Sequence, residues 1–145
     1  MTEREIKEIL KQYKDIPQCI DAKNCELSRL IRQKYELCAP SALRLTGLPK
    51  SKNKKDPTLN KVIELTEQYD KEVDRLTREI KLLTNKKSKI EENLSRLAPI
   101  EQKLIHLRYI ERKKWFVIEN ALHYSQRQPY YIHNRIIKTL AENWK

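Results

Sequence analysis

Hydrophobic residues recur every seven positions in the middle of the chain, between residues 59 and 97. One series, taken as heptad position a, consists of Val62, Tyr69, Leu76, Leu83, Ile90 and Leu97. The d series that accompanies it is interrupted only at Thr66 and Lys87. Charged residues of both signs lie between the two series, and residues 58–98 contain neither glycine nor proline. This pattern predicts a long coiled-coil helix over 59–97, which needs a partner helix to bury its apolar stripe.

A weaker heptad pattern runs through residues 1–37, where Lys23 and Lys34 interrupt the apolar stripe and Pro17 falls inside it. Because proline is tolerated in the first turn of a helix but not in its interior, we expect helices at about 3–15 and 17–37. Two partners for the long helix stay open. The N-terminal helices can fold back on it as an antiparallel hairpin, or a second copy of the chain can pair with it as a homodimer.

The connection over residues 38–58 contains three prolines and the single glycine of the chain. Its second half carries a cluster of lysines: Lys50, Lys52, Lys54 and Lys55. We expect a basic linker, and its lysines are candidates for contacts with DNA phosphates. A solvated connection without such contacts is the alternative.

The pattern changes after residue 98, and we assign residues 98–145 to a separate C-terminal domain. Pro99 marks the start of a helix that extends to about Ile110. A short helix is expected over 115–122, followed by a tight turn at 123–124 and a last helix. Two helices of these lengths joined by three or four residues have the proportions of a helix-turn-helix. The predicted fold is therefore all-α, with a long helical hairpin or coiled-coil stem followed by a small C-terminal helix-turn-helix domain.

The last helix is expected to begin after Ser125, which suits an N-cap and forms a capping box with Gln128 three residues later. Its outer face then carries side chains that read or flank base edges in the major groove: Gln126, Arg127, Tyr130, Tyr131 and Asn134. The candidates for phosphate contacts near it are Arg112, Lys113, Lys114 and Lys138.

The charge distribution supports a DNA partner. The net charge is +11, but residues 1–37 carry 8 basic and 7 acidic side chains, and residues 59–97 carry 9 and 8. The surplus lies in residues 38–58, with 5 basic and 1 acidic, and in residues 98–145, with 9 and 4. A localised basic surplus is typical of proteins that bind a polyanion.

Other classes of function lack their usual residues. Cysteines occur at 19, 25 and 38, without a C-x-x-C pair, and the histidines at 106, 123 and 133 are scattered. With one glycine there is no phosphate-binding loop, and no pair of carboxylates suggests acid–base catalysis. We therefore expect no enzyme activity, metal or cofactor. The sequence also contains no apolar run long enough for a membrane span and no signal peptide, so we expect a cytoplasmic protein.

A family resemblance covers the last third of the chain. The residues that carry it are Leu97, Pro99, Glu101, Leu104, Ile105, Leu107, Arg108, Tyr109, Trp115, Ile118, Ala121, Leu122, Tyr124 and Ser125. This segment resembles region 4 of sigma-70 family factors, and in particular the C-terminal part of ArpU- and RinA-like phage and prophage late-gene activators. The sequence departs from the pattern at His123, where the turn usually has glycine, and at Pro129.

The resemblance implies that Gln126, Arg127, Tyr130 and Tyr131 meet the −35 promoter element, with RNA polymerase as a further partner in the bacterial host cell. We accordingly predict a sequence-specific regulator of phage or prophage genes. The alternative is a DNA-packaging protein similar to a small terminase subunit, which would use the same motif to recognise a packaging site.

Overall fold

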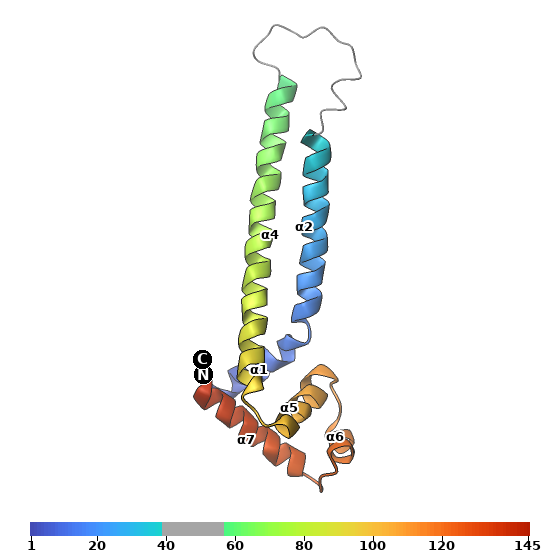
Figure 1. Cartoon of the computed structure of the whole chain (residues 1–145), viewed down its shortest axis with the longest axis vertical. Coiled ribbons are helices and arrows are strands. Elements are labelled where there is room, and N and C mark those ends of the chain that lie inside the picture. Colours follow the sequence, from blue (N-terminus) through green and yellow to red (C-terminus); the bar gives the residue numbers. More distant parts are fainter. Residues whose placement is uncertain (39–56) are drawn as a thin grey trace. The chain divides into compact units, whose positions relative to one another are not determined.

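The structure is a computed structural model that describes residues 1–38 and 57–145. Lys50, Lys52, Lys54 and Lys55, predicted to contact phosphates, lie outside these residues. The described part is all-α, as predicted, and contains no strand. Its helices are α1 (Glu3–Tyr13), α2 (Ile16–Cys38), α4 (Pro57–Ser95), α5 (Pro99–Ile105), the π-helical turn η1 (His106–Ile110), α6 (Trp115–Leu122) and α7 (Gln128–Asn143) (Figure 1).

The chain forms two compact units. One unit is the continuous segment Asp21–Leu82, and the other combines Met1–Ile20 with Leu83–Lys145. The second unit, called here the terminal unit, is larger than the predicted C-terminal domain over 98–145. It also contains α1, the first turn of α2 and the last three turns of α4.

The segment Asp21–Leu82 is a helical hairpin, in which α2 and α4 run antiparallel beside each other (Figure 1). The two lysines that interrupt the apolar stripe of α2 bind acids on α4: Lys23 Nζ lies 2.5 Å from Glu79, and Lys34 pairs with Asp70. A lysine can pack its aliphatic stem along an apolar stripe while its ammonium group reaches a partly exposed carboxylate. The helical hairpin that the heptads allowed is therefore present within the single chain described, and pairing with a second copy stays a prediction.

The break between α1 and α2 confirms the interpretation of Pro17. Helix α1 begins with a capping box formed by Thr2 and Glu5, and it ends at Tyr13. Helix α2 begins at Ile16, so Pro17 is its second residue, where the missing N–H leaves no hydrogen bond unmade.

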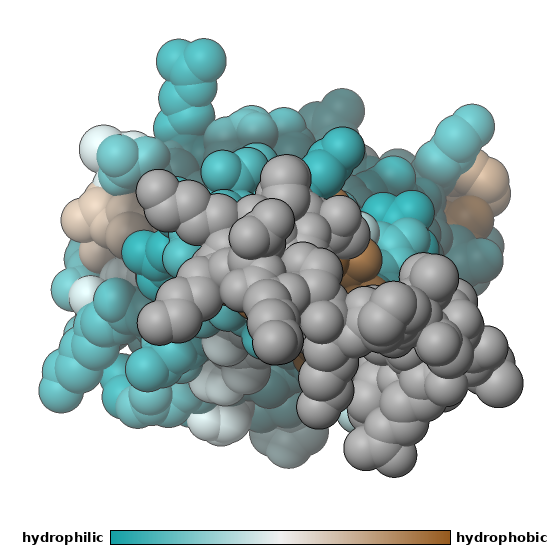
Figure 2. Space-filling view, turned by 90° about the horizontal axis from the view of Figure 1, so that it is seen from above, coloured by the Kyte–Doolittle hydropathy of each residue, from teal (hydrophilic) through white to brown (hydrophobic). Residues whose placement is uncertain are grey.

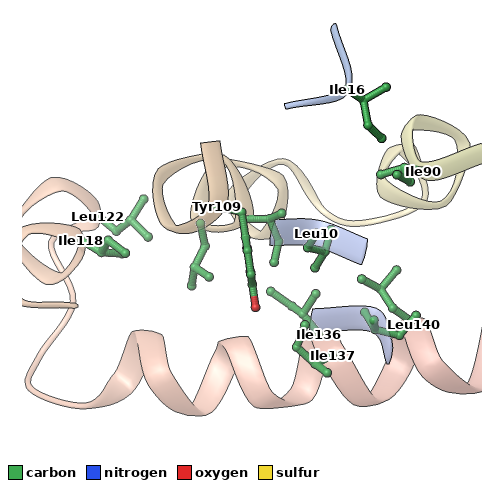
Figure 3. Close-up of a cluster of buried hydrophobic side chains, with 12 residues drawn as sticks. Leu10, Ile16, Ile90, Tyr109, Ile118, Leu122, Ile136, Ile137 and Leu140 are labelled. Carbon is green, nitrogen blue, oxygen red and sulfur yellow. The ribbon is translucent and has the colours of Figure 1, made fainter. Parts of the chain in front are cut away.

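The core of the terminal unit joins the two ends of the sequence. Ile6 and Leu10 of α1 are completely buried, as are Leu104 of α5 and Ile137 of α7. Figure 3 shows Leu10 and Tyr109 on the side of the cluster that faces α7, with side chains from α6 and α4 completing it. The buried apolar residues of this cluster are Ile6, Leu10, Ile16, Ile90, Leu104, Ile105, Tyr109, Ile118, Leu122, Ile136, Ile137 and Leu140. Helix α1 is therefore a structural part of the unit that contains the helix-turn-helix.

The surface reflects the high content of charged residues. In the view of Figure 2 most of the described surface is hydrophilic, and hydrophobic residues show only as small patches. Within the described ranges, no helix combines the length and the apolar character needed to cross a bilayer.

Candidate nucleic-acid interface

The connection between α6 and α7 differs from the predicted tight turn. Helix α6 ends at Leu122 and α7 begins at Gln128, so residues 123–127 join them. His123 adopts the left-handed conformation, with φ 56° and ψ 36°, at the position where the related pattern has glycine. Arg127 is also left-handed, with φ 67°, and it occupies the N-cap of α7. A non-glycine residue in this region costs free energy, which the surrounding contacts must offset.

The prediction that Ser125 is the N-cap is therefore wrong. Its hydroxyl lies 3.2 Å from Gln128 Oε1, and no side chain caps α7. The reason is Pro129. With Ser125 as N-cap, the N–H of residue 129 would have to bond the Ser125 carbonyl, and proline has no N–H. The helix instead begins at Gln128, so that Pro129 lies at its second position. The longer connection is held to α6 by the Arg127 backbone N–H, which donates to Glu119 Oε1 at 3.0 Å.

The outer face of α7 presents most of the predicted base-contacting residues together. Tyr130 and Tyr131 are 49% and 65% exposed, Lys138 is exposed, and Asn134 is half-buried. Residues at positions 131, 134 and 138 follow the spacing of one helix face, and the buried Ile136, Ile137 and Leu140 lie away from it. Gln126 and Arg127 are also exposed, but they lie in the connection rather than on the helix.

The basic corner at residues 112–114 connects η1 to α6, and all three of its side chains are exposed. Arg112 has φ 53°, and its guanidinium lies 3.5 Å from Asp15. The corner is fixed from inside by Arg108, which donates to the Lys113 carbonyl at 3.1 Å and lies 4.5 Å above the Trp115 ring. The cation–π contact holds a guanidinium and an indole next to α7.

A groove beside α7 was not predicted from the sequence. It has a volume of about 540 Å³ and is lined by Lys7, Lys11, Arg108, Tyr109, Arg112, Trp115, Tyr130, His133 and Asn134. The two lysines come from α1, whose nearly balanced charge gave no reason to assign it a binding role. Only the burial of Ile6 and Leu10 against distant helices brings them here, and no local sequence signal reports that contact. We call this feature the basic groove.

His133 lines the basic groove and is almost completely buried. It is 5% exposed, its Nε2 lies 2.8 Å from the Tyr109 hydroxyl, and the two rings stack with centroids 5.7 Å apart. Trp115 packs edge-on against it at 5.2 Å. Burial lowers the pKa of His133 to about 4, an effect that the neighbouring Asn134 side chain partly opposes, so the imidazole is neutral at pH 7.

One family model matches this chain. A family model described as "Protein of unknown function (DUF722)" matches residues 29–142, which is most of the sequence. The chain belongs to this family. No curated protein matches it, and no solved structure matches it. The DUF722 match includes all of α4, the basic corner and the helix-turn-helix, whereas α1 lies before the matched residues.

Metal-binding side chains do not gather at this interface. Among residues 1–38 and 57–145, no group of three or more His, Cys, Asp or Glu residues is placed to hold a metal ion. The chemistry of the exposed groups is that of hydrogen bonding, aromatic contact and positive charge, which suits a polyanion with readable polar edges.

Proposed function

We propose that this protein is a sequence-specific DNA-binding regulator of transcription, in which α7 enters the major groove. The observation that carries the proposal is the exposed face of α7, with Tyr131, Asn134 and Lys138, next to the exposed basic corner at residues 112–114. The aromatic and amide groups would contact base edges, and the basic corner would contact phosphates on the flanking backbone.

The resemblance to region 4 of sigma-70 factors and to ArpU- and RinA-like activators gives the proposal its biological setting. It supports a role in phage or prophage gene expression, in the cytoplasm of a bacterial host, with RNA polymerase as a second partner. A single helix-turn-helix makes few contacts with bases. We therefore propose that pairing of two chains, or contact with RNA polymerase, increases the specificity for the DNA sequence.

Selection from a randomised DNA library tests sequence specificity directly. We expect the wild-type protein to enrich one motif. We expect Arg127→Ala to relax the preference at one position and to weaken binding by about 1–3 kcal/mol, because we propose that this exposed arginine, at the N-cap of α7, contacts a guanine edge. The measurement is the Kd for the enriched motif and for its single-base variants.

The matched control is Arg78→Ala, in the helical hairpin. The Nε of Arg78 donates to the Asp74 carbonyl within the same helix, α4. The substitution should leave the motif and the Kd unchanged. Failure of the wild-type protein to enrich any motif would contradict the proposed function. Enriched sites that map to a packaging start instead of promoters would contradict its regulatory part and favour the DNA-packaging alternative.

A further inference from the structure

The basic groove brings four cationic side chains to one side of α7. Lys7 and Lys11 come from α1, and Arg108 and Arg112 come from η1 and the basic corner. Two carboxylates offset part of this charge, because Glu8 pairs with Lys11 at 2.9 Å and Asp15 lies 3.5 Å from Arg112. Both pairs are exposed, and exposed pairs contribute little free energy, so an incoming anion can replace the carboxylates at small cost. Lys7 forms no ion pair within the described part of the chain.

We propose that the basic groove holds a backbone phosphate of bound DNA, and that Lys7 and Lys11 of α1 are phosphate-binding residues. This inference rests on the proposed function and extends it. It makes α1 part of the DNA interface, although α1 lies before both the predicted helix-turn-helix domain and the residues that the DUF722 model matches.

The walls of the groove connect it to the base-contacting face. Tyr130 and Asn134 line the groove and also belong to the outer side of α7. A phosphate bound between these residues and α1 would therefore lie directly beside the helix that enters the major groove. Phosphate contacts in this position fix the depth and the register of a recognition helix on the duplex.

His133 also lines the basic groove. Its Nδ1 is buried and has no hydrogen-bond partner among the described residues, while its Nε2 lies against the Tyr109 hydroxyl. The Tyr109–His133 contact therefore fixes two of the side chains that line the groove.

The test is the salt dependence of DNA binding by the double variant Lys7→Ala/Lys11→Ala. The slope of log K against log salt concentration should fall in magnitude by about 1, because the two lysines neutralise the one phosphate in the groove, and the affinity should fall about equally for all sequences. The enriched motif should stay the same, because these residues contact no base. Lys7→Arg/Lys11→Arg should retain the wild-type slope, which separates charge from a structural effect of truncation.

A matched control is Lys81→Ala/Lys89→Ala, which removes two exposed lysines from α4. Its slope should equal that of the wild type. If the wild-type protein binds its motif and the α1 double variant keeps the full slope and affinity, the inference is overturned while the proposed function stands. If the wild-type protein binds no DNA, the proposed function fails, and the inference fails with it.

A second measurement distinguishes a DNA phosphate from a free anion. In a Trp144→Phe background, Trp115 is the single tryptophan and reports on the groove that it lines. We expect its fluorescence to change on addition of motif DNA and to lose that change in the α1 double variant. Saturation of the signal by inorganic phosphate alone, together with unaltered DNA binding by the α1 variant, would instead identify a free-anion site and overturn the inference.

Discussion

Replacing Leu10 with alanine should lower the free energy of unfolding of the terminal unit by about 2–5 kcal/mol. Leu10 is completely buried, although it lies in the first turns of the sequence, and its cluster includes Ile136, Ile137 and Leu140 of α7. The substitution removes apolar contacts and leaves a cavity among helices that come from opposite ends of the chain. Such a loss is a large part of the total stability of a small domain. The proposed binding of DNA should fall as the folded fraction falls.

Urea denaturation followed by tryptophan fluorescence measures this effect, because Trp115 and Trp144 both pack against the same core. The control is Leu82→Ala on α4, where the leucine is 69% exposed and the same substitution should change stability by less than about 0.5 kcal/mol. Equal stability of the Leu10 variant and the wild type would show that α1 does not belong to the folded terminal unit.

Acidification should destabilise the terminal unit through His133. Its pKa is about 4 in the folded chain and about 6.5 when the chain unfolds, so the unfolded state binds the proton more tightly. Stability is therefore fully present above pH 6.5 and declines as the pH falls toward 4. The lost free energy should reach about 2 kcal/mol at pH 5 and approach about 3 kcal/mol below pH 4.

Denaturation curves at pH 7 and pH 5 measure this contribution, and a His133→Phe variant isolates it. Phenylalanine keeps an aromatic ring against Tyr109 and Trp115 but cannot titrate, so the variant should lose about 2 kcal/mol less than the wild type over this interval. An identical pH dependence in the wild type and the His133 variant would refute the assignment.

Local patterns predicted the helices well. The heptads over 59–97 correspond to α4, the position of Pro17 separated α1 from α2, and α6 occupies its predicted residues 115–122. These features depend on neighbouring residues, whose spacing and proline content set the helix boundaries. The hairpin was one of two arrangements that the heptads allowed, because an apolar stripe demands a partner without specifying which surface supplies it.

The candidate site was predicted only in part. The exposed side chains of α7 could be predicted from helical periodicity. The first residue of that helix could not, because Ser125 favours a start directly after it, whereas Pro129 lacks the N–H that this start requires, and the helix begins at Gln128. The basic groove depends on contacts between α1 and α7, which no local pattern encodes. Lys7 and Lys11 therefore looked like ordinary residues of a charged helix face.

The discontinuous terminal unit sets an order of events during synthesis. Helix α1 is made before α7, so the cluster that contains Ile6, Leu10 and the buried residues of α7 is complete only when α7 has been made. The segment Asp21–Leu82 forms a compact unit of its own, so we expect it to fold before α7 has been made. A hairpin that forms first lowers the entropy cost of joining Met1–Ile20 with Leu83–Lys145, because the chain between them is already folded. We therefore expect the hairpin to fold before the terminal unit is complete, and until α7 is made the apolar face of α1 lacks part of its core.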